Sequence, residues 1–208
     1  MSNYYNWKES INENELSEII NILKNNGIII FPTETVYGIG GNALCDEVID
    51  KIYEVKQRPR EKALNIMLAS IDDIEKYAEI TSELERKIIK NFMPGPITII
   101  LKKKPNFGNG FTLSNNTIGI RIPDNKIINS ILKKLDFPII APSANISGKP
   151  SAVEVSDIIK NFDNKVDAII NGGRANLGIS STIVQVTNNK IKILRQGRIT
   201  KDDILKKI

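Results

Sequence analysis

Several cations gather around a proline in this chain. The segment 56–62 reads KQRPREK, with Lys56 before Pro59 and Lys62 after it. A solvated helix end would explain Lys56, because cations near a helix C-terminus interact favourably with the helix dipole. Arg58 and Lys62 flank the proline and precede an apolar run, so rigid backbone could hold them against a triphosphate. The segment alone leaves both interpretations open.

Hydroxyl groups follow the apolar run Ile28–Phe31. Pro32 ends this run, and the next residues carry three hydroxyls and one carboxylate: Thr33, Glu34, Thr35 and Tyr37. Ligands of open α/β sheets bind at the ends of strands, so a buried strand here would place these groups at a site. A polar turn after a core strand is the alternative.

The segment 141–151, APSANISGKPS, is stiffened by prolines and carries short hydrogen-bonding groups. Ser143 and Asn145 lie on its predicted turn. Ser151 and Glu154 resemble a capping box, so we expect a helix to begin at Ser151, where free backbone N–H groups favour phosphate. Ordinary turn and cap chemistry would explain the same residues.

Two further arginines lie in or after strand-like runs. Arg121 is flanked by isoleucines in TIGIRIP, so it needs either solvent at a sheet edge or a carboxylate in the fork of its guanidinium. Arg195 follows the last apolar run, and Ser181 lies in GISST before another strand. GISST lacks the spacing of a P-loop. Together, hydroxyls or a cation at several strand ends predict one concave anion site.

The chain contains no histidine and one cysteine, Cys45. This inventory excludes a plausible zinc site and any nucleophile activated by histidine. It also excludes an internal disulfide and fits a reducing compartment. Group transfer at phosphorus stays possible, because it depends on positioning and on cations around developing charge. The net charge of +5 suits an anionic ligand, although lysine-rich proteomes show the same balance.

Size and hydropathy describe an ordinary globular protein. The 208 residues, 41% hydrophobic and 25% charged, predict a single domain spanning 1–208. No apolar run approaches the ~20 residues of a membrane span, and the N-terminus does not resemble a secretory signal. We therefore expect a cytoplasmic protein with no membrane partner.

Helical patterns and short apolar runs alternate along the chain, which predicts an α/β fold with a mixed sheet. Expected helices span 14–26, 46–57, 82–93, 124–135 and 151–161, with short ones after Ser70 and Thr200. Expected strands span 28–31, 64–69, 97–101, 118–122, 138–141, 166–170, 182–186 and 190–194. Asp46, Ser70, Ser82 and Thr200 are expected to cap helices. The polar segment 102–116 predicts a loop, and Asn188-Asn189 a hairpin turn.

A set of spaced motifs covers most of the chain, from Asn14 to Ile199. In order, they are PTETVYG, KxRP with Lys62, MPGPIT, TIGIRIP, APSANISGKPS, GISSTIV and ILRQG. This order resembles the YrdC-like family in its short single-domain form. The resemblance implies a twisted open mixed sheet with flanking helices around a basic concave cavity. It also implies a nucleotidyltransferase, an L-threonylcarbamoyladenylate synthase that forms threonylcarbamoyl-AMP and pyrophosphate from L-threonine, bicarbonate and ATP.

The resemblance also implies partners and site residues. The adenylate would feed a separate transferase complex that makes N6-threonylcarbamoyladenosine at position 37 of tRNA. Threonine would be bound by Thr35, Arg121, Ala141 and Ser181. ATP would be bound by Arg58, Lys62, Thr117, Ser143, Ser151 and Arg195. The family's Lys-x-Arg and Ser-x-Asn signature, and with it a catalytic role, would fall on Lys56, Arg58, Ser143 and Asn145. Mg²⁺ would be held mainly by the ATP phosphates, with no metal site of the protein.

Two positions depart from the family pattern, because many members carry proline at Ala63 and histidine at Met67. Since the sequence stops near Ile208, the resemblance leads us to expect the short form without the C-terminal domain of longer members, in which the cavity would close differently or stay more open. Two alternatives remain. One is a double-stranded RNA or tRNA-binding module of the same fold, although no RRM, KH or double-stranded RNA signature is present. The other is the related carbamoyl-transfer domain of hydrogenase maturation, which normally has zinc-binding and acylphosphatase-like segments.

Overall fold

The computed structural model describes residues 1–105, 107 and 116–208. Its strands are β1 Asn3–Asn6, β2 Ile29–Phe31, β3 Gly38–Gly40, β4 Asn65–Met67, β5 Ala78–Glu79, β6 Ile97–Lys103, β7 Thr117–Arg121, β8 Ile139–Ile140, β9 Ala168–Asn171, β10 Thr182–Thr187 and β11 Lys190–Arg195. Its helices are α1 Glu13–Lys24, α2 Asp46–Val55, α3 Ile74–Tyr77, α4 Glu83–Phe92, α5 Lys126–Leu132, α6 Ser156–Phe162 and α7 Lys201–Leu205, with a 3₁₀ turn at Ile71–Asp73. Most of the loop predicted at 102–116 lies outside the described residues.

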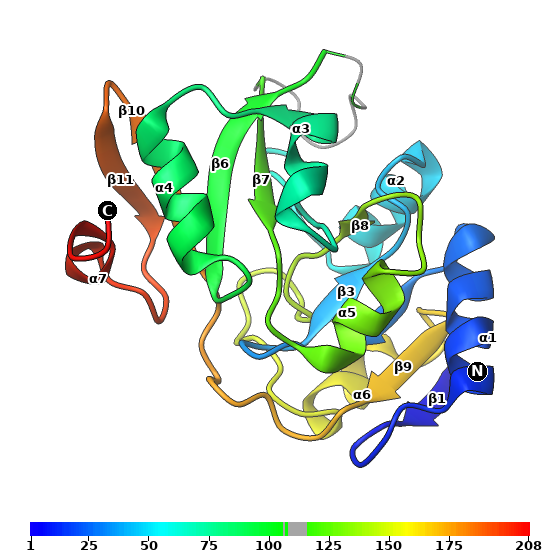
Figure 1. The fold of residues 1–208 in the computed structure, drawn as a ribbon. Helices are drawn as coiled ribbons and strands as arrows, with labels where there is room; N and C mark the ends of the chain where they lie inside the picture. The colour runs from blue at the N-terminus through cyan, green and yellow to red at the C-terminus, as the bar shows by residue number, and fades with distance from the viewer. Residues whose placement is uncertain (106, 108–115) are drawn as a thin grey trace.

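The strands form two mixed sheets, which confirms the α/β class (Figure 1). The smaller sheet has the order β1-β9-β2-β3, and the larger has the order β11-β10-β6-β7-β4-β8, with β5 paired to β6. Parallel pairs such as β6 with β10 and β4 with β7 alternate with antiparallel ones. The two chain termini lie at opposite ends of the molecule (Figure 1).

The two sheets meet along a seam formed by residues 37–43 and 138–144. Isolated bridges join Gly38 to Ser143 and Asn42 to Ile139. Backbone hydrogen bonds reinforce the seam, among them one from the amide of Ala144 to the carbonyl of Tyr37 at 2.7 Å. The seam brings the end of the small sheet beside the strand ends of the large one.

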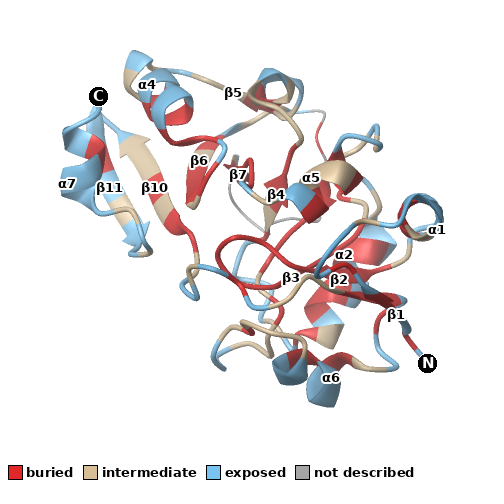
Figure 2. Ribbon diagram, turned by 60° about the horizontal axis from the view of Figure 1, so that its bottom comes forward, coloured by how far each residue is buried: buried red, intermediate tan, exposed pale blue. Residues whose placement is uncertain are grey.

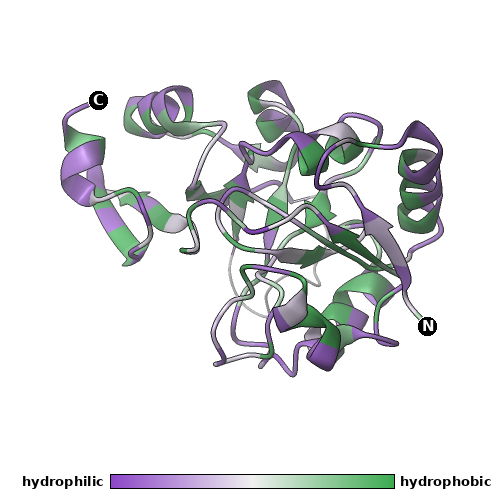
Figure 3. Cartoon of the chain, turned by 90° about the horizontal axis from the view of Figure 1, so that it is seen from below, coloured by the Kyte–Doolittle hydropathy of each residue, from purple (hydrophilic) through white to green (hydrophobic). Residues whose placement is uncertain are grey.

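Amphipathic helices cover both sides of the strands. Helices α3, α4 and α5 lie on one side and α6 on the other (Figure 2). Apolar residues of the helices alternate with polar ones along the ribbon (Figure 3). The predicted apolar face of α1 is buried as expected: Leu16, Ile19, Ile20 and Leu23. Burial of such a face, at about 25 cal/mol per Å² of apolar surface, is what holds these short helices to the sheets.

Capping predictions were partly confirmed. Ser82 forms a capping box with Glu85, and Thr200 forms one with Asp203. The prediction at Ser151 was wrong, because α6 begins only at Ser156. Two backbone amides, those of Val153 and Glu154, instead donate to the carboxylate of Asp157. A side chain from within the helix thus takes the donors that Ser151 was expected to leave for a phosphate.

The other observed caps lie one residue from the predicted position or cap a different kind of turn. Cys45, without a side-chain hydrogen bond, precedes α2, so Asp46 is its first residue and not its cap. Helix α5 is capped by Asn125, whose amide oxygen accepts from two backbone amides. Ser70 caps only the 3₁₀ turn, through the amide of Asp72. The hairpin turn was predicted correctly, since Asn188 and Asn189 both have positive φ between β10 and β11.

Three strands were not predicted. Strand β1 pairs with β9 at the N-terminus, where Tyr5 and Trp7 are buried in the core. Strand β3 lies inside the turn-like sequence after Pro32, and β5 has two residues. Among the described residues, no helix is long and apolar enough to cross a bilayer.

Candidate functional site

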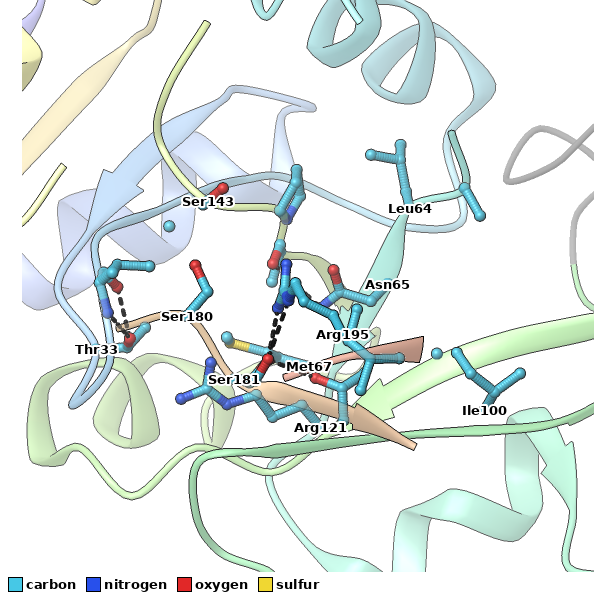
Figure 4. A pocket seen from close by; sticks show the side chains of 18 of the residues that line it. Thr33, Leu64, Asn65, Met67, Ile100, Arg121, Ser143, Ser180, Ser181 and Arg195 are labelled. Atoms are coloured by element: carbon cyan, nitrogen blue, oxygen red, sulfur yellow. Dashed lines mark hydrogen bonds between the residues drawn. The ribbon is translucent and has the colours of Figure 1, made fainter. Parts of the chain in front are cut away.

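A cavity of about 250 Å³ lies at the ends of strands from both sheets (Figure 4). Its walls include side chains from seven of the twelve positions predicted as site residues: Arg58, Thr117, Arg121, Ala141, Ser143, Ser181 and Arg195. These residues are scattered through 138 positions of sequence, from 58 to 195 inclusive. The fold therefore brings together most of the residues that the sequence singled out.

Three arginines and no carboxylate belong to the cavity wall formed by the described residues. The remaining polar wall groups are hydroxyls and one amide, including Thr98, Ser180 and Asn65. Burial first, and then the charges of Arg121 and Arg58, lower the pKa of Arg195 from its ordinary value. Like charges held this close favour an anionic ligand over an empty site.

Arg121 ends strand β7 and is the most buried of the three. Its Nε donates to the carbonyl of Gly95 at 3.3 Å, and its Nη2 donates to Oε1 of Glu34 at 2.5 Å. The two side chains of this ion pair are only 5% and 10% exposed. Of the two alternatives for the strand arginine, the structure thus has the carboxylate partner, which Glu34 supplies from the turn after β2.

Arg195 ends strand β11 and is held by Ser181 (Figure 4). Its Nε and Nη2 donate to the carbonyl of Ser181 at 3.1 and 2.8 Å, and Nη2 also donates to the serine Oγ at 3.0 Å. The Ser181 hydroxyl lies 2.8 Å from that of Thr98 on β6. This network fixes a guanidinium on the cavity wall without using a carboxylate.

Arg58 lies beyond the end of α2, in the loop that leads to β4. Its Nε donates to the carbonyl of Lys62 at 2.9 Å, and its Nη2 donates to that of Ala63 at 2.7 Å. Burial lowers its pKa from the ordinary value. Like Arg195, it is anchored by neutral carbonyls, and no carboxylate of the described residues pairs with it to offset its charge.

Lys56 does not line the cavity but lies behind its wall. The side chain is 1% exposed, and its Nζ donates to the carbonyls of Ser143 and Asn145, both at 2.6 Å. Burial, and secondarily the charge of Arg58, lowers its pKa to about 7. Lys56 therefore holds the loop that presents Ser143, and its ammonium group does not line the cavity.

Asn145 has a similar supporting position. Its Oδ1 accepts from the hydroxyl of Ser143 at 2.5 Å, and its Nδ2 donates to the carbonyls of Ile146 and Lys149. Ser143 lines the cavity, whereas Asn145 lines a separate hollow beside it. The Ser-x-Asn signature thus consists of one residue at the cavity and one residue that orients it.

Three other predicted residues do not form the wall. Thr35 is fully buried, with its hydroxyl 2.8 Å from that of Thr33. Lys62 is exposed, and only its backbone carbonyl engages Arg58. Ser151 borders the hollow beside Asn145, and its hydroxyl lies 3.3 Å from that of Ser180 on the cavity wall.

Sequence reasoning missed several wall residues. Thr33 lines the cavity in place of Thr35, because its Oγ1 accepts from the amides of Thr35 and Val36 and so folds the turn around itself. Tyr37 was noted as a hydroxyl group, and it donates to the carbonyl of Gly173 at 2.6 Å. Thr98 and Ser180 lie in the motifs MPGPIT and GISST but were not assigned a role, and Asn65 carried no signal beyond its polar type in an apolar run.

The described residues contain no cluster of three or more acidic, histidine or cysteine side chains that could hold a metal ion. Divalent cations such as Mg²⁺ need oxygen ligands, usually from carboxylates or from substrate phosphates. The described chain thus does not fit a resident metal, and we assign no step to one.

The fold and cavity define an α/β protein with a ligand site lined by arginines. The family model described as Telomere recombination, Sua5/YciO/YrdC, matches residues 21–197. The chain therefore belongs to the Sua5/YciO/YrdC family.

Three relatives illustrate the similarity. A putative threonylcarbamoyl-AMP synthase of Methanocaldococcus jannaschii is 40% identical over 91% of this chain and 90% of its own length. The threonylcarbamoyl-AMP synthase of Bacillus subtilis is 35% identical over 94% of this chain, but only 57% of its own length is covered. The structure of P. abyssi Sua5 complexed with L-threonine is 34% identical, with a TM-score of 0.94 over 99% of this chain and 60% of the other. The chain thus spans somewhat over half the length of two of these relatives.

Proposed function

We propose that this protein is a threonylcarbamoyl-AMP synthase. It would join L-threonine, bicarbonate and ATP, and release threonylcarbamoyl-AMP, pyrophosphate and water. The convergence of Arg58, Arg121 and Arg195 on one hydroxyl-lined cavity is the observation that carries the proposal. Family membership and the names of the M. jannaschii and B. subtilis relatives support it over the RNA-binding module.

The cavity offers different groups for the two larger substrates. The carboxylate of threonine would meet Arg121, with Ala141 and Ser181 beside it, and the L-threonine in the P. abyssi Sua5 structure supports an amino-acid subsite in this fold. The phosphates of ATP would meet Arg58 and Arg195, with Thr117 and Ser143 on the same wall. Lys62, exposed next to Arg58, would reach the phosphates from the solvent side.

The bond changes of the reaction are compatible with this inventory. The threonine amine forms a bond to the carbon of bicarbonate, and water leaves to give a carbamate. A carbamate oxygen then attacks the α-phosphorus, and the bond from that phosphorus to the pyrophosphate oxygen breaks. Negative charge accumulates on the leaving pyrophosphate, so fixed guanidinium groups lower the barrier by stabilising it. Mg²⁺ would arrive with the ATP phosphates.

The carbamate decomposes in water, so its subsite must exclude solvent. Apolar wall residues such as Leu64, Met67 and Ile100 limit the water that can reach the reacting groups. Met67 stands where many family members have histidine, so a methionine thioether replaces one polar contact to threonine at this position.

Downstream, the adenylate would be consumed by a tRNA threonylcarbamoyl transferase that modifies position 37. A protein in this role would work in the cytoplasm, where tRNA is modified. Direct contact with tRNA would be secondary to synthesis of the adenylate.

Pyrophosphate release with each substrate withheld in turn tests the proposal. The complete mixture should release pyrophosphate, and omission of L-threonine or bicarbonate should abolish release. Mass spectrometry should detect threonylcarbamoyl-AMP in the complete mixture alone. Equal release without threonine, or salt-sensitive tRNA binding without any ATP consumption, would contradict the assignment.

A further inference from the structure

The buried ion pair between Glu34 and Arg121 is expected to contribute little to the stability of the fold. Both side chains are at least nine-tenths buried, and removing two charges from water costs much of what their attraction returns. The second carboxylate oxygen, Oε2 of Glu34, is buried and has no hydrogen-bond partner among the described residues. A buried acceptor left without a donor is costly, so such groups in native proteins call for an explanation.

The surroundings of Glu34 show how firmly it is placed. The Thr33 hydroxyl accepts from two backbone amides and donates to the carbonyl of Val36 at 2.6 Å, which fixes the turn. The backbone carbonyl of Glu34 accepts from the amide of Leu177 at 2.9 Å. The backbone that carries Glu34 is therefore fixed, so its carboxylate restricts the position of the arginine and does not move with it.

The geometry at Arg121 explains what this placement achieves. Gly95 holds Nε and Glu34 holds Nη2, while Nη1 makes no hydrogen bond to a described residue. Because the guanidinium group is planar, fixing two of its nitrogens fixes the direction of the third. The same carboxylate offsets the charge of Arg121, whereas Arg58 and Arg195 on the cavity wall have no carboxylate partner.

We propose that Glu34 is a positioning residue for recognition of the amino acid: it locks the Arg121 guanidinium toward a carboxylate and makes it a weaker target for phosphate. This inference rests on the proposed function and deepens it. Without Glu34, the long arginine side chain would be free to turn, and its full charge would attract the triphosphate or pyrophosphate. Glu34 would thus keep the two anion subsites of one cavity distinct.

The test compares Glu34→Gln with the wild-type protein in steady-state pyrophosphate release. Gln keeps the size of the side chain but removes its charge. We expect the KM for L-threonine to rise at least tenfold, the KM for ATP not to rise, and inhibition by added pyrophosphate to become at least threefold stronger. Glu34→Asp, which keeps the charge but withdraws it by one methylene, should show a smaller rise in the KM for threonine.

A second substrate makes the test specific to the carboxylate. L-Threoninamide keeps the amine and side chain of threonine but lacks the carboxylate. Wild-type protein should discriminate strongly between threonine and this amide in competition, and Glu34→Gln should discriminate at least tenfold less. A purely structural role would not alter this ratio.

Glu85→Gln is the matched control, since Glu85 is another buried carboxylate, 4% exposed, and serves the capping box of α4. It should leave both KM values within twofold. If Glu34→Gln is folded and its threonine KM and discrimination are unchanged, the inference is wrong although the proposed function stands. If wild-type protein releases no threonine-dependent pyrophosphate, the proposed function itself fails. If Glu34→Gln does not fold, Glu34→Asp decides through the same two measurements.

Discussion

The cavity contains the same side chain in two different settings. On one side, Arg121 is buried and paired with the carboxylate of Glu34. On the other, Arg58 and Arg195 are anchored by backbone carbonyls and a serine hydroxyl, which fix their direction but leave their charge intact. A neutralised, rigid guanidinium suits one small carboxylate, whereas uncompensated ones suit a triphosphate. The partner bonded to an arginine, and not only the residue type, therefore sets which anion the arginine is suited to bind.

The largest effect should come from the phosphate side. Arg58→Ala removes an uncompensated cation from the wall, and loss of one such group at a developing charge costs about 10²–10³-fold in turnover. The midpoint of thermal unfolding should change little, because the described hydrogen bonds of the Arg58 side chain go to carbonyls of its own loop. Pyrophosphate release and a thermal melt check the two expectations.

Arg60→Ala is the matched control for Arg58→Ala. Arg60 lies two residues away, pairs with Asp50 on the surface and stacks over Tyr53, outside the cavity wall. Its loss should change turnover less than twofold. Equal losses in the two variants would mean that general positive charge matters and that the subsites are not distinct.

The amino-acid side should respond differently. Arg121→Ala should raise the KM for L-threonine about 10–100-fold, the range expected when a charge-assisted contact of roughly 1.5–3 kcal/mol is lost. The KM for ATP should rise less. Because the variant leaves Glu34 buried without its partner, stability should also fall by about 3–5 kcal/mol. Denaturant melts and separate titrations of the two substrates measure these effects, and a larger change for ATP would overturn the division.

The smallest effect concerns Lys56, the cation behind the wall. Its pKa is lowered from 10.5 to about 7, so between these pH values the unfolded chain binds more protons than the folded one. Stability should therefore rise with pH from 7 toward 9, by about 1 kcal/mol per pH unit. The absence of histidine leaves few other groups that titrate in this window.

Urea denaturation at pH 6, 7, 8 and 9 checks this slope. Lys56→Met, which keeps the length of the side chain and removes its charge, should be less stable overall because the carbonyls of Ser143 and Asn145 lose their donor. Its stability should also depend less on pH. If the free energy of unfolding changed with pH equally in wild-type protein and Lys56→Met, Lys56 would not titrate as the burial argument requires.

The arginines at strand ends could be predicted because an apolar run with one charge is conspicuous, and the alternation of patterns gave the fold class. The hydrogen-bond partners of side chains within the turns could not be predicted. The choice of Thr33 over Thr35 depends on which hydroxyl folds back onto the backbone, and both residues have the same chemistry. The helix start predicted at Ser151 was wrong because a capping-box pattern also fits a turn. In this turn the carboxylate of Asp157 accepts from the amides of Val153 and Glu154.

The approach of the two sheets has its own consequence. At Gly40, an added Cβ would stand 2.0 Å from the carbonyl oxygen of Ile140, so even alanine would push the strands apart. The same contact line continues to Ser143 and Gly38, which face the cavity. Neither half of the molecule can therefore form the pocket alone, and loosening this line would open the arginine-lined walls on both sides at once.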